Sequence, residues 1–198
     1  MTRIRCRARA ALLACVVCVA ACGHSGDGTE PLAPVALPSV RVTDVDGAGA
    51  SIDAYLGRIL VLNVWATWCG PCRKELPSLD RLSHRLDARH FAVAGVAVDN
   101  DRIAVREYLL RSGIGFPNYV AADGREFQSA LAMRTLPQTL IIATDGSLID
   151  RIEGARSWDS AASVARIEAA LLRGGGPVAE QPAAAGDQTP AGRRHFPG

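Results

Sequence analysis

The chain has 198 residues, of which 48% are hydrophobic and 21% charged, and its formal net charge is +2. These values fit one well-buried globular domain and leave too little chain for a second one. All basic residues except Lys74 are arginines, and no basic stripe interleaved with aromatic residues occurs, so nucleic acid is excluded as an expected partner.

The N-terminus has the pattern of an export signal. Four arginines precede an uncharged apolar run at 10–21, which is shorter than the roughly 20 residues that span a membrane. The run ends in "VAAC", which resembles the lipobox of bacterial lipoproteins, where the cysteine is lipidated after cleavage. We therefore expect a signal peptide over 1–21 and a lipid anchor on Cys22, with an uncleaved signal anchor as the alternative. Cleavage at the earlier "LLAC" would leave too short an apolar region before Cys15.

Cleavage before Cys22 changes both the net charge of the protein and the number of its free thiols. The net charge would go from +2 to −2, because four arginines and no acids leave with the signal, so charge gives no indication of partners. Only Cys69 and Cys72 would remain as free thiols. A disulfide framework needs several pairs, and a zinc site needs four ligands. The four histidines supply no pair at short spacing, so we expect no metal.

Two segments without hydrophobic periodicity bracket the predicted domain. Residues 22–37 are rich in glycine, proline and alanine and predict a flexible tether. Residues 174–198 have the same composition and predict a disordered tail. A single domain is expected over 38–173.

Strands and helices alternate within this domain. Continuous apolar runs predict strands buried on both faces, and leucines at helical spacing predict the helix between the first two. The turn at Asp145-Gly146 predicts a β-hairpin. The expected fold class is α/β, a central mixed β-sheet with helices on both faces. In chain order the expected elements are a strand at 58–66, a helix at 70–86, a strand at 91–98, a helix at 102–112, a strand at 117–121, a helix at 124–132, a hairpin at 138–154 and a helix at 158–172.

The cysteine pair lies at the junction of the first predicted strand and helix, in the sequence "WCGPC". A sulfur at the first turn of a helix lies near unpaired N–H groups and the positive end of the dipole, which stabilises thiolate over thiol. This position makes Cys69 the expected nucleophile, and Cys72, three residues on, the thiol that resolves the mixed disulfide. Gly70 and Pro71 allow a partner's backbone to approach and start the helix. The structural alternative is two small core cysteines.

"WCGPC", followed much later by "TLPQT" ahead of a hairpin, resembles the thioredoxin fold. The lipobox and the inserted "DNDRIAVREYLLRSGIGFP" narrow the resemblance to the exported, membrane-anchored thioredoxin-like family of the TlpA, ResA and CcmG kind. The likeness covers nearly all of the predicted domain, about 38–173.

This resemblance implies a substrate-binding loop. Pro137 matches the family's cis-proline, and Leu136 supplies the preceding backbone, which binds an extended substrate. Trp68 is either part of the partner surface or a packing residue. Pro77 matches a proline that kinks the active-site helix, and Trp65 is expected in the core.

Three polar residues near the cysteines carry further expectations. Asn63 stands where thioredoxin has a buried aspartate that assists proton transfer, a role that an amide cannot take. Glu75 matches an acid of the ResA-like branch that influences the proton chemistry of the cysteines; the alternative is a first-turn carboxylate favoured by the helix dipole. Asp99, at the end of a predicted strand, is a second candidate for the same purpose.

The resemblance implies a lipid-anchored extracytoplasmic thiol–disulfide oxidoreductase without a bound cofactor, facing the periplasm or extracytoplasmic space. We expect a monomeric reductant that receives electrons from a membrane thiol reductase and passes them to an oxidised protein substrate, as in cytochrome c maturation. The rival within the class is a disulfide-forming oxidant or isomerase. A Sco-like copper-delivery protein would need CxxxC and a histidine ligand, and a peroxiredoxin would need threonine or serine where Ala66 stands.

Overall fold

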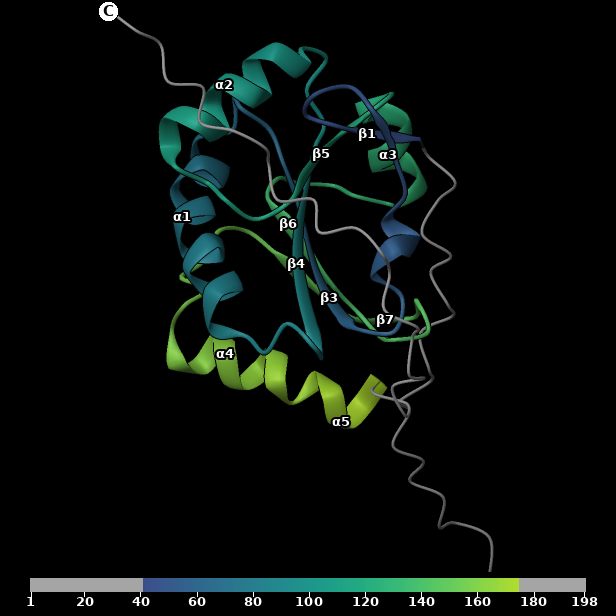
Figure 1. The fold of residues 1–198 in the computed structure, drawn as a ribbon, viewed down its shortest axis with the longest axis vertical. Helices are drawn as coiled ribbons and strands as arrows, with labels where there is room; N and C mark the ends of the chain where they lie inside the picture. Colours follow the sequence, from purple (N-terminus) through teal and green to yellow (C-terminus); the bar gives the residue numbers. More distant parts are fainter. Residues whose placement is uncertain (1–40, 175–198) are drawn as a thin grey trace, which may run out of the picture. The chain divides into compact units, whose positions relative to one another are not determined.

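The computed structural model describes residues 41–174 (Figure 1). The predicted signal peptide, Cys22, the tether and residues 175–198 lie outside the described residues. No helix within 41–174 has both the length and the apolar character needed to cross a membrane.

The centre of the domain is a seven-stranded mixed sheet in the order β2-β1-β5-β4-β3-β6-β7. Its two middle strands, β3 (Ile59–Trp65) and β4 (Phe91–Ala97), are parallel and buried along their whole length, as their apolar runs predict. Beside β4 lies β5 (Asn118–Ala121), also parallel. On the other side, β6 (Gln138–Ile142) pairs antiparallel with β3, and β7 (Leu148–Glu153) completes the predicted hairpin.

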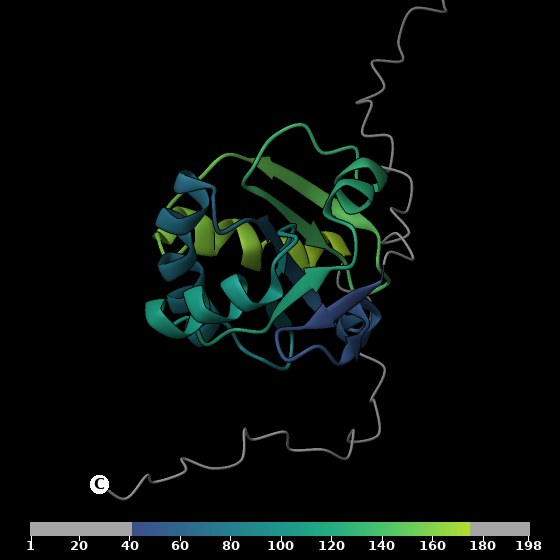
Figure 2. The same cartoon turned by 90° about the horizontal axis from the view of Figure 1, so that it is seen from above.

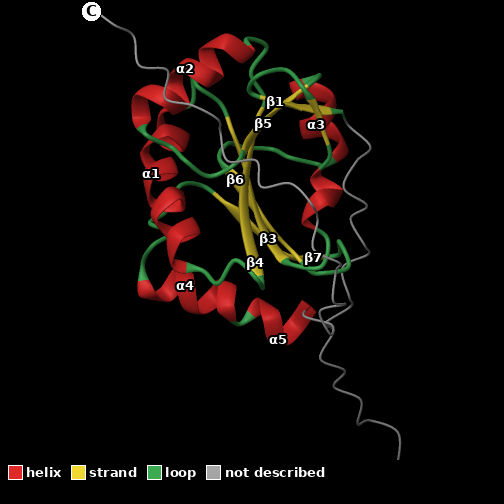
Figure 3. Ribbon diagram, in the orientation of Figure 1, coloured by secondary structure: helices red, strands yellow, loops and turns green. Residues whose placement is uncertain are grey.

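Helices cover both faces of this sheet. In Figures 1 and 2, α1 (Gly70–Arg85), α2 (Arg102–Ser112), α4 (Ala161–Glu168) and α5 (Ala170–Gly174) lie on one face, and α3 (Gly124–Ala130) lies on the other with the 3₁₀-helix η1 (Ile52–Tyr55). The secondary-structure colouring of Figure 3 shows the same three layers. The α/β thioredoxin-like class expected from the sequence is confirmed.

The inner side of α1 packs into the core. Leu76, Leu79 and Leu82 are completely buried on the inner side of α1, and Trp65 is completely buried at the end of β3. The Trp65 ring packs against Tyr108 of α2, with ring centroids 5.5 Å apart. This packing fixes the N-terminal end of α1, where the cysteines lie.

The last helix differs from the prediction of a single helix over 158–172. It begins at Ala161, because the Ser160 hydroxyl caps it by accepting from the Ser163 N–H, and it is interrupted at Ala169. Trp158 lies before this helix and is buried, with its N–H groups bonded to α1 side chains. The spacing of hydrophobic residues could not predict that Trp158 is buried in the segment before the helix.

Both ends of the domain also differ from the prediction. Two short strands, β1 (Val42–Asp44) and β2 (Gly49–Ala50), extend the sheet on the β5 side, although their residues show no long apolar run. The disordered tail was expected from residue 174, but Gly174 ends α5, and its carbonyl accepts hydrogen bonds from Thr144. A Cβ on Gly174 would lie 2.6 Å from Ile149, so this close approach requires glycine.

Candidate active site

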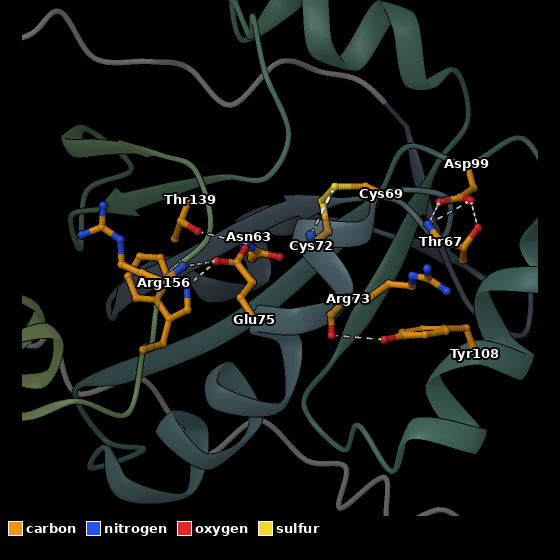
Figure 4. The surroundings of a disulfide bond; sticks show 11 residues. Asn63, Thr67, Cys69, Cys72, Arg73, Glu75, Asp99, Tyr108, Thr139 and Arg156 are labelled. Carbon is orange, nitrogen blue, oxygen red and sulfur yellow. Dashed lines mark hydrogen bonds between the residues drawn. A yellow bond between two sulfur atoms is a disulfide. The ribbon is translucent and has the colours of Figure 1, made fainter.

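The two cysteines lie where β3 leads into α1 and are joined by a disulfide (Figure 4). Cys69 is the N-cap of α1, and its Sγ accepts a hydrogen bond of 3.2 Å from the Cys72 N–H. Cys69 is 7% exposed, whereas Cys72 is 0% exposed. An incoming sulfur can therefore reach Cys69 and not Cys72, which matches the order of roles expected from the sequence.

The helix end supplies the electrostatic part of the site. As N-cap, Cys69 lies among the N–H groups that have no partner within the helix, and these groups carry the positive end of the helix dipole. Both effects favour the thiolate form of Cys69 once the disulfide is reduced.

The residues beside Cys69 leave the site open to a partner. Trp68 is 69% exposed, so it belongs to the surface and not to the core. Pro71 is exposed, and a Cβ built on Gly70 would meet no atom within 4 Å. The space next to the cysteines is therefore unfilled by the described part of the chain.

The Leu136–Pro137 peptide bond is cis, as the resemblance implied. The neighbouring residue Gln138 pairs with Val64 in β6 and β3, which places Pro137 at the end of β3 that leads to Cys69. The Pro137 carbonyl accepts from the Gly154 N–H at 3.0 Å. Within residues 41–174, the backbone groups of Leu136 make no hydrogen bond, so they can bind another chain.

Glu75 is buried on the sheet side of α1 and is only 2% exposed. The alternative of a first-turn surface carboxylate is therefore wrong: Glu75 is the sixth residue of α1 and faces the core. Its Oε2 accepts from the Trp158 indole N–H at 2.9 Å and from the Arg156 backbone N–H at 3.2 Å. Its Oε1 accepts from the Asn63 Nδ2 at 2.8 Å.

These surroundings act on the Glu75 carboxyl in opposite directions. Burial raises its pKa above the ordinary value of 4.5 and is the largest effect, while the bonds from Trp158, Asn63 and Arg156 lower it. The balance leaves the pKa raised. Glu75 therefore holds a proton more readily than an exposed glutamate does.

Asn63 connects this carboxylate to the sheet. Its Nδ2 also donates to the Thr139 hydroxyl at 2.9 Å, while its buried Oδ1 has no hydrogen-bond partner within the described residues. In Figure 4 the Asn63 side chain lies between Glu75 and Cys72. An amide accepts no proton here, so Asn63 orients Glu75 instead of replacing it as an acid.

Asp99, the second candidate acid, contacts the loop before the cysteines. Its carboxylate oxygens accept from the Thr67 backbone N–H, at 3.0 and 3.2 Å, and from the Thr67 hydroxyl. In Figure 4 this contact lies on the side of the cysteines away from Glu75. Asp99 therefore holds in position the loop that carries Trp68.

The sequence did not predict Trp158 or Thr139, which complete the hydrogen-bonded network around Glu75 and Asn63. Both contacts join residues more than 70 positions apart, and only the fold brings them together. The burial of Glu75 did have a signal, because Glu75 precedes Leu79 by four positions and Leu82 by seven, the spacing of one helix face.

Other places for a ligand lie away from the cysteines. Residues 41–174 contain no group of three or more histidine, cysteine or acidic side chains arranged to hold a metal. One open cavity is lined by the C-terminal end of α1 and the beginning of β4, including His84, Leu86 and Phe91. These are the ends of α1 and β4 opposite to the cysteines.

Comparison with known proteins shows the family to which the chain belongs. The profile of the family described as Redoxin matches residues 33–171. The chain belongs to the redoxin family. Within it, the chain is a thioredoxin-like thiol–disulfide oxidoreductase of the TlpA, ResA and CcmG type.

Three known proteins illustrate the similarity. The thiol-disulfide oxidoreductase ResA of Bacillus thuringiensis (strain Al Hakam) is 30% identical over 118 residues, which are 59% of this chain and 67% of that protein. A thiol:disulfide interchange protein of Chlorobium tepidum TLS is 28% identical, with a TM-score of 0.57 over 66% of this chain and 92% of that one. A secreted Mycobacterium tuberculosis disulfide oxidoreductase is 21% identical, with a TM-score of 0.56 over 65% and 94%, and shows the shared fold alone.

Proposed function

We propose that this redoxin is an extracytoplasmic reductant of protein disulfides. The observation that carries the proposal is the asymmetry of the cysteine pair, in which Cys69 caps α1 and touches solvent while Cys72 is fully buried. One sulfur is placed to attack an outside disulfide and the other to release the product.

The reaction begins from the reduced pair. The Cys69 thiolate attacks one sulfur of the partner's disulfide, the S–S bond breaks, and the partner's other sulfur leaves as a thiolate. Cys72 then attacks the Cys69 Sγ as a thiolate and displaces the second partner sulfur. The partner has gained two electrons, and the Cys69–Cys72 disulfide is the oxidised product of the protein.

The loop at Pro137 holds the substrate during this exchange. The backbone groups of Leu136 have no partner within residues 41–174 and lie beside the cysteines, so they can pair with an extended substrate segment. Trp68, Gly70 and Pro71 form the open side of the same site.

Glu75 serves as a proton carrier in this proposal. Cys72 is buried and must lose its proton before it can attack Cys69. Glu75 lies one helical turn further along α1, and its raised pKa lets it take up a proton at a higher pH than an exposed glutamate would. Asn63, Trp158 and Arg156 keep its carboxylate facing inward.

The residues between the cysteines support the proposed direction of electron flow. Gly70 and Pro71 add no charge that would stabilise the Cys69 thiolate further, and a less stabilised thiolate gives a less oxidising disulfide. We infer that a membrane thiol reductase supplies the electrons and that the acceptor is an oxidised protein, as in cytochrome c maturation. The protein would need no bound cofactor.

The export signal supports a location outside the cytoplasm. We propose cleavage after residue 21, lipidation of Cys22, and residues 22–37 as a tether between the membrane and the domain. Labelling of the full chain with a radioactive fatty acid, compared with a Cys22→Ala variant, tests the anchor.

Variants of the two cysteines test the proposed mechanism. With the full chain in detergent, we expect Cys69→Ala to abolish reduction of insulin disulfides, because the attacking sulfur is lost. Cys72→Ala should still attack and then remain joined to the substrate, visible as a mixed disulfide on a non-reducing gel. Equal trapping by both variants would contradict the assignment of roles, and unchanged turnover in Cys69→Ala would contradict the mechanism.

A further inference from the structure

The charge beside the cysteines is unusual for the start of a helix. The fourth and fifth residues of α1 are Arg73 and Lys74, and no acidic residue occupies the first turn. Positive side chains are unfavourable near a helix N-terminus, where the dipole is already positive. The N-cap also differs, since α2 and α3 are capped by the acids Asp101 and Asp123 and α1 by Cys69.

Arg73 and Lys74, named here the basic rim, also lack partners. Both are exposed, and within residues 41–174 neither side chain makes a hydrogen bond, ion pair or cation–π contact. Some other surface arginines are paired, as Arg81, Arg106 and Arg166 are with an aspartate, whereas the exposed Arg134 and Arg173 make no such contact within residues 41–174. The basic rim therefore leaves two positive charges unpaired on the exposed surface at the start of α1.

The basic rim follows Cys69 within about one and a half turns of α1, and the Arg73 N–H donates to the Cys69 carbonyl at 3.1 Å. Arg73 directly follows Cys72, and Figure 4 shows its side chain leaving α1 on the side of Tyr108, away from Glu75. The carboxylates nearest the cysteines are occupied, because Glu75 is buried in its network and Asp99 is bonded to Thr67. The exposed face around Cys69 thus combines the aromatic Trp68 with two unpaired positive charges.

We propose that this face selects protein disulfides flanked by acidic residues. Trp68 supplies apolar contact area, and the basic rim attracts aspartate or glutamate side chains next to the partner's cysteines. Charges this close to the attacked bond also raise the rate of encounter with an acidic partner. The inference rests on the proposed function, because it names the substrate class of the same site.

The test uses three peptides that share one disulfide and differ only in the flanking residues, which are glutamate, glutamine or lysine. The reduced full chain is mixed with each peptide, and the second-order rate of disulfide reduction is measured. We expect the glutamate peptide to react about 10-fold faster than the lysine peptide at low ionic strength. The difference should shrink in 0.5 M salt, since the screening length is then only a few ångström, about 3–8 Å.

Charge reversal identifies the residues responsible. Arg73→Glu with Lys74→Glu should invert the preference, and it should leave the fold intact because both positions are exposed and acids are favoured there. The matched control is Arg89→Glu with Arg173→Glu, which makes the same change of charge at two exposed positions outside the site and should keep the preference.

The glutamine peptide separates the inference from the proposed function. If it is reduced while the glutamate and lysine peptides react within two-fold of each other, the charge selection is wrong and the reductase function stands. Retention of the preference by the Arg73/Lys74 variant would also overturn the inference. If none of the three peptides is reduced, both the proposed function and the inference fail.

Discussion

At the scale of single residues, the site depends on one buried acid whose surroundings determine its charge. Glu75 has three hydrogen-bond donors, from Asn63, Trp158 and Arg156, yet burial outweighs them and raises its pKa. A carboxyl whose folded pKa lies above its unfolded value binds more protons in the folded state. Its contribution to stability is therefore most favourable below the unfolded pKa and is lost as the pH rises through the folded pKa.

This linkage predicts a pH-dependent difference between the wild type and Glu75→Gln. From about pH 4.5 upward, the free energy of unfolding of the wild type should fall relative to that of the variant, until the pH passes the folded pKa. Urea denaturation of both oxidised proteins between pH 4 and pH 8 measures the difference. A constant difference over this range would show that the Glu75 pKa is the same in the folded and unfolded states, and the proposed role as proton carrier, which relies on a raised pKa, would fail with it.

Residues of the site differ in how far the sequence could predict them. Cys69 and Cys72 could be assigned because their chemistry depends on a short spacing, and Pro137 could be assigned because it matches the family's cis-proline. Trp158 and Thr139 could not, since their contacts with Glu75 and Asn63 exist only once distant segments pack together. The role of Glu75 was left open between proton chemistry at the cysteines and a first-turn carboxylate favoured by the helix dipole, because its contacts with Asn63 and Trp158 exist only in the fold.

At the scale of elements, the junction of β3 and α1 positions the cysteines, and its support comes from neighbouring strands. Gly95 of β4 lies between Asn63 of β3 and Asn118 of β5 in the register. Asn118 accepts from the Trp65 indole N–H at 2.9 Å and thereby holds the end of β3. A Cβ on Gly95 would lie 2.1 Å from the Asn118 Oδ1 and 3.1 Å from the Trp65 Nε1.

We therefore expect Gly95→Ala to destabilise the protein by about 1–3 kcal/mol, because the added methyl group displaces Asn118 and breaks its bond to Trp65. Gly49→Ala is the matched control, since a Cβ there meets no atom within 4 Å, and it should change stability by less than about 0.5 kcal/mol. Urea denaturation followed by tryptophan fluorescence measures both. If both substitutions changed the free energy of unfolding equally, the side chains around Gly95 would have moved aside without loss of stability.

The long buried elements could be predicted and the marginal ones could not. Apolar runs predict β3 and β4 because both faces of these strands are covered, and leucine spacing predicts α1. The two-residue strand β2 and the three-residue strand β1 carry too few residues for a pattern. The start of the last helix was misplaced because Trp158 is buried by contacts with α1 and not by helical periodicity.

At the scale of the whole molecule, the cysteine pair lies at one end of a thioredoxin-like domain, and we propose that it acts as a reductant. The fold and the family establish the oxidoreductase class. Electron flow toward protein disulfides depends on the stability of the disulfide relative to the dithiol, which is a property of the entire site. Charge beside Cys69 comes from the helix end and the basic rim, while the residues between the cysteines add none.

The midpoint potential of the Cys69–Cys72 pair is the measurement that tests this account most directly. Equilibration of the full chain with dithiothreitol or glutathione buffers at pH 7, followed by determination of the oxidised fraction, gives the value. Thioredoxin, the reducing relative, stands at about −270 mV and the strong oxidant DsbA at about −120 mV. We predict a midpoint between about −220 and −290 mV, as expected for a reductant, and a midpoint above about −160 mV would show that electrons flow in the opposite direction.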